Sequence, residues 1–452
     1  MGSIDIRTFT EILFEKGKKL GFEDMEVYYT GSDSFDIKVY KSEIDSYNVN
    51  SSMGLSFRGI INGKMTYSFT ERFNEDDIDY LLNLAVKNSN EVEIIGEDHI
   101  FEGSDNYHSE FSNNYSEVDS AKKIQDAILL EKKGSEIDNR IETVQHCMLQ
   151  TAKGTRRIIN TKGLDLSEES GVCMAYISVV ASDGESKKSG SSFNMVESYG
   201  SLDFDAIAKE AVEEATIKIG AVTPKTGKYK IILRYDAAAE LLSTFAGVFS
   251  AESVQKGLSL LKDKLNTKIA CDKITIIDNP FLECSASKTT FDDEGVATKE
   301  KCLIEKGILK TYLHNLKTSK KDGVESTGNG FKSSYKAPVD ISPTNLYIQS
   351  GERNLEDIIS ELDSAIMITE LQGLHSGANS VSGDFSLAAL GMYIENGKVV
   401  GPVEQMTISG NFYSLLRDVV EVANDFKLSV PTSAGGVGSS SILIKEMNIS
   451  GK

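Results

Sequence analysis

The stretch AVTPKTGKYK at residues 221–230 constrains the fold most, because the sequence pattern changes across it. Before it, helical and strand patterns alternate in blocks, and after it short strand patterns dominate. Pro224 and Gly227 are typical of a connecting segment. A chain of 452 residues is also too long for one ordinary hydrophobic core. We therefore predict two domains, residues 1–222 and 223–452.

The first half predicts helices combined with antiparallel strands. Apolar residues recur at helical spacing in residues 7–20, after Asn74, at about 118–133, and at 203–219. Strand patterns include MEVYYT, SFDIKVYKSEIDSYNV and GLSFRGIINGKMTYSF, and Asn62-Gly63 in the last is a strong hairpin signal. Lys153-Gly154 and Lys162-Gly163 are interpreted as further tight turns.

The second half predicts a mostly β domain. Strand patterns recur from YKIILRY to SSSILIKEMNI, with hairpin turns expected at Lys306-Gly307 and Asn396-Gly397. Helical patterns interrupt them at 236–250, 251–265, 354–362 and 411–421. Many short strands with few helices favour a large curled sheet or open barrel. The predicted class is α+β, with a mixed helix and antiparallel-sheet domain first and this β domain second.

Charge, hydropathy and the first residues limit the partners and the location of the chain. A formal net charge of −20 repels phosphate backbones, so we expect no direct nucleic-acid contact. No window approaches 18 uninterrupted apolar residues, which predicts no membrane span. The first residues lack the pattern of a signal peptide, and the cytoplasm is the expected location.

No complete catalytic site is recognisable from local motifs. The five histidines never stand three or four residues apart, and the five cysteines never form C-x-x-C. There is no G-x-S-x-G motif, and the glycine-rich GGVGSSS leads into a strand pattern rather than a helix. The adjacent acids Asp292, Asp293 and Glu294 are interpreted as a solvated turn. We therefore assign no catalytic residue to this chain.

One segment, LQGLHSGANSVSGDFSLAALGMYIENGK, is dense in glycine and small polar residues. Glycine allows the backbone to approach a ligand or another chain closely. The same composition also suits a tight β-bend with Asx-turns, in which a side chain bonds to nearby backbone. The residues alone leave both interpretations open.

Five segments together resemble the TldD/PmbA family over nearly the whole length of the chain. They are GLSFRGIINGKMTYSF, FDDEGVATKEKCLIEKGILKTYLHN, STGNGFKSSY, GLHSGANSVSGDFSLAALGMYIENGK and PVEQMTISGNFYSLL. The last two resemble the PmbA/TldE branch. The specificity lies in the order and spacing of these segments, since none is a catalytic signature alone.

The resemblance implies a subunit of a metallopeptidase that holds no metal itself. In TldD-type subunits a helix carries H-E-x-x-x-H, and a late cysteine completes the metal site. The matching helix here reads ELLSTFAGVFSAES, so Ser243 and Thr244 replace the His-Glu pair and Val248 replaces the second histidine. The late segment VANDFKLSVPTSAGGVGSSS also lacks cysteine. We expect no cofactor in this chain and zinc in a TldD-type partner.

The resemblance also implies a partner and a substrate class. The partner is a TldD-type subunit in a heterodimer, or a second copy in a homodimer, and the substrate is unfolded peptide. The residues expected to line the substrate cavity are Asn329, Gly373, His375, Ser376, Gly377, Asn379, Ser382 and Asp384. Two alternatives stay open. One is a peptidase in its own right, acting as a homodimer with a noncanonical site. The other is a non-enzymatic interaction or modulator protein. The family label "modulator of DNA gyrase" suggests nucleic-acid contact, but the net charge of −20 gives no support for a direct contact.

Overall fold

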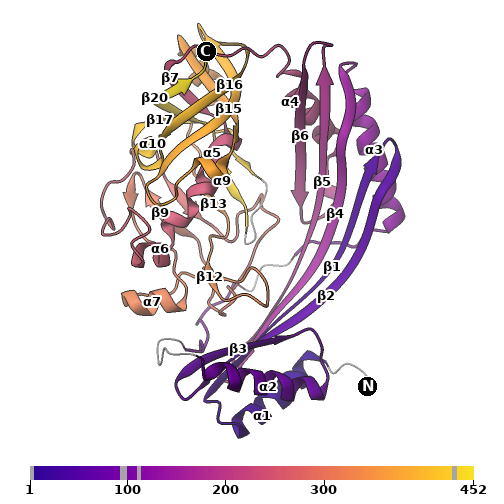
Figure 1. The fold of residues 1–452 in the computed structure, drawn as a ribbon, viewed down its shortest axis with the longest axis vertical. Helices are drawn as coiled ribbons and strands as arrows, with labels where there is room; N and C mark the ends of the chain where they lie inside the picture. The colour runs from indigo at the N-terminus through magenta and orange to yellow at the C-terminus, as the bar shows by residue number, and fades with distance from the viewer. Residues whose placement is uncertain (1–4, 92–98, 109–112, 430–434) are drawn as a thin grey trace.

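The computed structural model describes residues 5–91, 99–108, 113–429 and 435–452. The first half forms a long, curved antiparallel sheet (Figure 1). Its strand order is β3-β2-β1-β4-β5-β6. The strands are β1 (Asp24–Tyr40), β2 (Glu43–Ile61), β3 (Lys64–Thr70), β4 (Ile141–Asn160), β5 (Asp165–Ser182) and β6 (Lys187–Val196).

Two pairs of helices cover this sheet at its opposite ends (Figure 1). The pairs are α1 (Ile6–Lys19) with α2 (Glu75–Ser89), and α3 (Ser120–Glu136) with α4 (Phe204–Thr216). Each pair buries its own apolar cluster against the strands. The side chain of Asp5 begins α1 by accepting the N–H groups of Arg7 and Thr8 at 3.0 and 3.2 Å. The first half is therefore one sheet with two small cores.

Of two turns predicted in the first half, one is confirmed and the other is wrong. Asn62 and Gly63 have φ angles of 54° and 68°, the left-handed pair that a tight hairpin requires, so that prediction is confirmed. The turn predicted at Lys153-Gly154 is wrong, because β4 continues through both residues. Gly154 pairs with Ser32 on one side and Ser170 on the other, so two neighbouring strands hold it extended.

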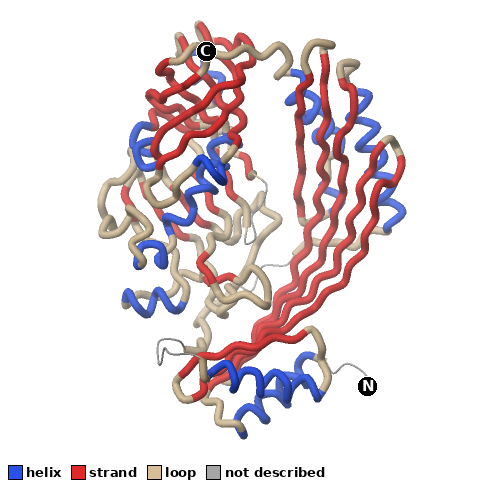
Figure 2. Tube along the Cα trace, viewed as in Figure 1, coloured by secondary structure: helices blue, strands red, loops and turns tan. Residues whose placement is uncertain are grey.

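The second half contains a five-stranded barrel, which confirms the predicted mostly β class. The strand order is β16-β15-β14-β7-β20, and β16 pairs with β20 to close the ring. The strands are β7 (Gly227–Leu233), β14 (Ser364–Gln372), β15 (Asp384–Glu395), β16 (Lys398–Asn411) and β20 (Ile442–Ser450). A further strand, β17 (Val419–Val422), pairs with β20. Figure 2 shows these strands gathered at one end of the molecule.

A second, irregular sheet lies beside the barrel and has the order β10-β9-β8-β13-β19-β18. Its strands are β8 (Ile276–Asp278), β9 (Lys301–Glu305), β10 (Ile308–Leu309), β13 (Leu346–Ile348), β18 (Lys427–Leu428) and β19 (Val437–Ser439). The short strands β11 (Gly330–Phe331) and β12 (Asp340–Ile341) form a separate pair. The helices are α5 (Tyr235–Phe245), α6 (Ala251–Gln255), α7 (Leu316–Asp322), α8 (Leu355–Ser360), α9 (Leu374–Gly377) and α10 (Phe412–Asp418).

The helix predicted at 251–265 is largely wrong. Only α6 forms there, and Gly257 follows it with a φ of 73°, a left-handed conformation that ends a helix. The predicted helix at 236–250 is an α-helix followed by a 3₁₀ turn, η2 (Ala246–Phe249). Among the described residues, none of the helices combines the length and apolar content needed to cross a bilayer.

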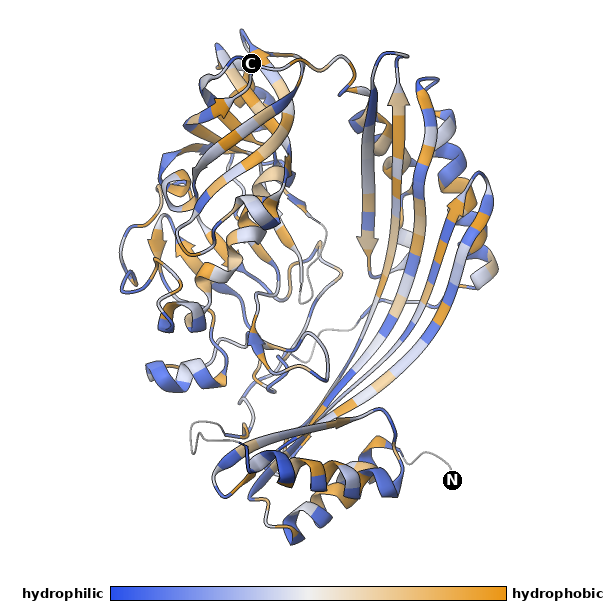
Figure 3. Cartoon of the chain, in the orientation of Figure 1, coloured by the Kyte–Doolittle hydropathy of each residue, from blue (hydrophilic) through white to orange (hydrophobic). Residues whose placement is uncertain are grey.

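The large apolar clusters fall on separate sides of the segment at 221–230. Counting the partly buried residues packed against them, the barrel clusters use residues from 229 onward, and the two clusters under the curved sheet use residues up to 219. Figure 3 shows the alternation of apolar and polar residues along the long strands. The connecting segment forms two backbone hydrogen bonds to the second half of the chain. The N–H of Val222 donates to the carbonyl oxygen of Pro402 at 3.1 Å, and the carbonyl oxygen of Pro224 accepts the N–H of Lys452 at 3.0 Å. The division into residues 1–222 and 223–452 stays a prediction.

Candidate functional site

Helix α5 and the η2 turn carry Ser243, Thr244 and Val248, the three residues that the family resemblance aligns with metal ligands. Thr244 already uses its hydroxyl, which donates to the carbonyl oxygen of Glu240 at 2.8 Å. Val248 is only 1 % exposed and packs in the barrel cluster. A hydroxyl is a poor zinc ligand and a valine is none, so these positions do not fit the metal of the family. In the part of the chain that the structure describes, no group of three His, Cys, Asp or Glu side chains could hold an ion.

A small cavity of about 230 Å³ adjoins Ser243 on this helix. Its other lining residues are mostly small or apolar: Ala246, Gly247, Ser250, Leu313, Ile341, Ser342, Pro343 and Val437. The cavity can accept one side chain by shape and apolar contact. The late segment in which a cysteine was sought includes residues 430–434, which lie outside the described residues.

Glu240 lies one turn before Ser243 and is the unusual acid of this helix. One of its carboxylate oxygens is buried without a hydrogen-bond partner among the described residues. Burial, followed by the negative charge of Asp236, raises the pKa of Glu240 to about 7. This carboxyl group therefore exchanges its proton near neutral pH.

The residues predicted for substrate binding at 373–384 form an exposed loop around α9. Asn379 accepts the N–H groups of Val381 and Ser382 at 3.0 and 3.1 Å, which is an Asx-turn. Asp384 accepts the side-chain amide of Asn411 at 2.9 Å, and the hydrogen bond from that amide lowers its pKa. The polar residues thus shape the loop that they occupy.

The three glycines of this loop have local structural roles. Gly373 and Gly383 have φ angles of 80° and 82°, which side chains rarely adopt. A Cβ atom at Gly377 would collide with the carbonyl oxygen of Ser386 in β15. His375 and Ser376 lie exposed beside these glycines. The bend is present, and contact with a substrate remains a prediction.

Asn329 lies elsewhere and is fully buried. Its amide donates to Asp278 at 2.9 Å and to the carbonyl oxygen of Ser342 at 3.0 Å. Its carbonyl oxygen accepts the hydroxyl of Thr327 at 2.8 Å. Among the described residues, no hydrogen bond connects Asn329 with the loop at 373–384. That Asn329 and this loop line one substrate cavity therefore stays a prediction.

The acids at 292–294 correct the expectation of a solvated turn, because all three are buried. Asp292, Asp293 and Glu294 are 0, 3 and 5 % exposed. Arg156 of β4 donates to Asp293 at 2.7 Å, and Arg58 of β2 lies 3.5 Å from Glu294. The sequence could not reveal these contacts, because the arginines are more than 130 residues away in the chain. These ion pairs connect the curved sheet with the second half of the molecule.

Arg58 and Asp292 show how the cluster pairs most of its polar groups, although Nη2 of Arg58 is buried without a hydrogen-bond partner among the described residues. The guanidinium of Arg58 donates to the buried Glu26 at 2.6 Å. Asp292 accepts three backbone N–H groups, from Glu294, Val296 and Gly330. Burial and the adjacent Glu294 nevertheless raise the pKa of Asp292. The cluster is therefore a dense network of opposite charges with little access to water.

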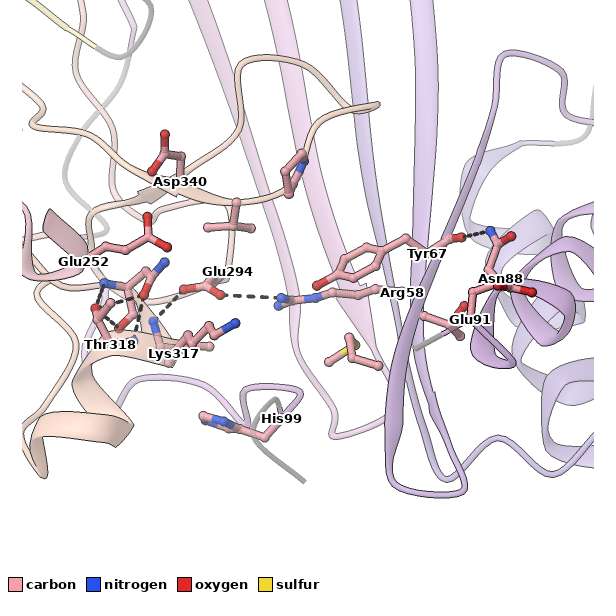
Figure 4. A pocket seen from close by; sticks show the side chains of 16 residues that line it. Arg58, Tyr67, Asn88, Glu91, His99, Glu252, Glu294, Lys317, Thr318 and Asp340 are labelled. Atoms are coloured by element: carbon pink, nitrogen blue, oxygen red, sulfur yellow. Dashed lines mark hydrogen bonds and ion pairs between the residues drawn. The ribbon is translucent and has the colours of Figure 1, made fainter. Parts of the chain in front are cut away.

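A polar cavity of about 920 Å³ opens beside this network, and Figure 4 shows it from close by. One wall carries Arg58, Tyr67, Asn88 and Glu91, which belong to the curved sheet and α2 or follow that helix. The opposite wall carries Glu252, Glu294, Lys317, Thr318 and Asp340 from the second half. The cavity therefore lies between the two halves of the molecule.

Family models match three successive segments that cover most of the chain. They are PmbA/TldA metallopeptidase domain 1 at residues 25–89, the central domain at 113–219 and the C-terminal domain at 226–451. The chain belongs to the PmbA/TldD metallopeptidase family. The resemblance predicted from the sequence is therefore confirmed at the level of the family.

Two solved structures of PmbA/TldD relatives share the whole fold, and a further relative is similar in sequence. A Thermotoga maritima protein described as a candidate modulator of a DNA gyrase is 33 % identical, with a TM-score of 0.90 over 99 % of this chain and 100 % of its own. TldE from Thermococcus kodakarensis is 26 % identical, with a TM-score of 0.90 over 98 % and 100 %. A metalloprotease of Methanocaldococcus jannaschii is 27 % identical over 427 residues, which is 90 % of this chain and 91 % of that protein.

Proposed function

We propose that the chain is the metal-free, PmbA/TldE-type subunit of a cytoplasmic metallopeptidase. In this proposal it binds unfolded peptide and completes the active-site cavity of a TldD-type partner that holds zinc. The observation that carries the proposal is the set of side chains on α5 and η2, where Ser243, Thr244 and Val248 cannot replace zinc ligands. The similarity to a structure named TldE supports the same branch.

The contribution of this chain is binding and orientation. Zinc in the partner would supply an activated water for peptide hydrolysis. The cavity beside Ser243 provides apolar contact for one side chain of the peptide. The exposed loop at 373–384 provides backbone and small polar groups, which recognise an extended chain without strong sequence preference. Correct orientation of a substrate alone can lower a barrier by several kcal/mol.

The test is a peptidase assay on three samples: this chain, a TldD-type subunit, and their mixture, with an unfolded protein as substrate. We expect no cleavage above background by this chain alone and chelator-sensitive cleavage by the mixture. Gly377→Leu should reduce cleavage by the mixture while the zinc content of the partner stays unchanged. Gly200→Leu serves as the matched control, because a Cβ atom there meets no neighbouring atom.

Two results would overturn the proposal. Chelator-sensitive cleavage by this chain alone, free of partner, would show a peptidase in its own right. Capture of a TldD-type subunit with no effect on its cleavage rate would indicate an interaction protein without a role in proteolysis.

A further inference from the structure

The short strand β12 has one open edge. Among the described residues, β12 pairs only with β11. Gly330, the register partner of Ile341, bonds away from β12: its N–H donates to Asp292 at 2.9 Å, and its C=O accepts the N–H of Asp293 at 2.8 Å. Opposed residues of an antiparallel pair either bond to one another or both bond outward, so the N–H and C=O of Ile341 point away from β11. This edge can therefore pair with an extended chain.

Two of the cavities meet at β12. Asp340 lines the polar cavity of about 920 Å³, and Ile341 lines the cavity of about 230 Å³ beside Ser243. Helix α6 contributes to both, since its N-cap Ser250 lines the smaller cavity and Glu252 lines the larger. Successive residues of a strand direct their side chains to opposite faces. A chain paired with the open edge would therefore direct successive side chains into the two cavities in turn.

The smaller cavity suits an apolar side chain. No charged residue is among the described residues that line it, and Leu313, Ile341, Pro343 and Val437 supply apolar contact. An apolar cavity of about 150 Å³ can bind benzene. The volume of about 230 Å³ is therefore enough for the side chain of leucine or phenylalanine.

The larger cavity favours a cation. Its lining has four carboxylates against two Arg or Lys side chains, namely Glu91, Glu252, Glu294 and Asp340 against Arg58 and Lys317. Arg58 and Glu294 lie 3.5 Å apart and offset one another, and Lys256 pairs with Glu252 at 2.9 Å. Asp340 is exposed, accepts the N–H of Ile341 at 2.7 Å, and forms no ion pair with another described residue. Figure 4 shows Glu252 and Asp340 on the same wall. A cationic side chain beside β12 therefore meets the uncompensated charge of Asp340.

We propose that the open edge of β12 binds an extended peptide in which an apolar and a basic residue are adjacent. The apolar side chain lies opposite Ile341 and enters the smaller cavity. The basic side chain lies opposite Asp340, where opposite charges on neighbouring strands stabilise the pairing. The inference rests on the proposed function for the class of ligand, an unfolded peptide, and adds a preference within that class. The net charge of −20 also favours the approach of basic peptides.

The test measures peptide binding to this chain alone by fluorescence anisotropy. One labelled peptide is Ser-Lys-Leu-Lys-Ser, and its control of the same composition is Lys-Ser-Leu-Ser-Lys, both with blocked termini. In the control the lysines lie on the same face as the leucine, so both cavities cannot be satisfied. The first peptide should bind at least about threefold more tightly.

Charge reversal at Asp340 tests the assignment of the basic position. Asp340→Lys should lose the preference for Ser-Lys-Leu-Lys-Ser and bind Ser-Glu-Leu-Glu-Ser about threefold more tightly instead. The gained affinity also shows that the variant is folded. Glu136→Lys is the matched control, because it makes the same change of charge at an exposed position of α3, which Figure 1 shows on the other side of the curved sheet from β12. It should bind both lysine peptides like the wild type.

Three results would each overturn the proposal. They are equal affinity of the wild type for the two lysine peptides, an unchanged preference in Asp340→Lys, and absence of binding by both peptides. The measurement needs neither zinc nor a TldD-type subunit. Its failure is therefore distinct from a failure of the proposed function, which would appear as absent cleavage by the mixture of subunits.

Discussion

At the scale of single residues, Glu240 predicts a pH dependence of stability. Its pKa in the folded protein, about 7, lies above the ordinary value of 4.5, so folding strengthens its hold on the proton. The stabilising contribution is complete below about pH 4.5 and is lost as the pH rises to 7. Glu240→Gln does not titrate and should exceed the wild type in free energy of unfolding by on the order of 2 kcal/mol at pH 8.

Chemical denaturation at pH 4.5 and pH 8 checks this prediction. The difference between Glu240→Gln and the wild type should nearly vanish at the lower pH. Glu213→Gln is a suitable control, because Glu213 lies on an exposed helix face, where its side chain forms a surface ion pair with Lys209. An equal advantage of Glu240→Gln at both pH values would contradict the assigned titration.

The family resemblance, and not residue identity, aligned Ser243, Thr244 and Val248 with metal ligands, and it did not show the surroundings of each position. The burial of Val248, by contrast, follows from its apolar side chain. The unpartnered oxygen of Glu240 and the burial of Asp292–Glu294 depend on neighbours distant in sequence. No periodicity within one segment reports such neighbours.

At the scale of one element, the structure of α5 and η2 predicts that introducing the ligand residues of the family does not create a zinc site. Ser243→His, Thr244→Glu and Val248→His together restore the motif in sequence. A histidine at the 1 % exposed position 248 must enter a packed apolar core, and the late segment VANDFKLSVPTSAGGVGSSS contains no cysteine to act as a further ligand. We expect less than 0.1 zinc ion per chain after dialysis, measured by elemental analysis on protein purified without metal affinity. One retained zinc per chain would contradict this.

The contacts from β4 to residues 289–294 predict that replacing Arg156 lowers the free energy of unfolding much more than replacing its neighbour Arg157. Arg156→Met leaves the 4 % exposed carboxylate of Asp293 without its ion pair and should destabilise the protein by about 3 kcal/mol. Arg157→Met breaks a more exposed pair with Asp165 and should cost about 0.5 kcal/mol. Urea denaturation of both variants checks the contrast, and equal losses would contradict it.

Elements were predicted most reliably where a local signal decides the structure. Asn62-Gly63 and Asn396-Gly397 both form turns with positive φ angles, as the residue types require. Lys153-Gly154 has only a weak turn preference, and pairing with two neighbouring strands overrides it. The order of the strands in the curved sheet is a further feature that the sequence does not contain.

At the scale of the whole molecule, the separate apolar clusters predict that residues 1–222 and 223–452 fold when produced separately. Each fragment should be less stable than in the full chain, because separation breaks the ion pairs of Arg58 with Glu294 and of Arg156 with Asp293. Circular dichroism melting of each fragment should show a cooperative transition. A fragment 223–452 without any cooperative melting would contradict the proposed division.

The place of β20 in the barrel has a consequence for biosynthesis. This strand lies between β7, which opens the second half of the chain, and β16, yet it is made almost last. At about 5–20 residues per second, β7 waits roughly 10–40 s for the neighbour that closes the ring. The curved sheet needs no such late segment and can form while the ribosome is still translating. Unfinished barrel strands are then the part of the nascent chain most in need of a chaperone.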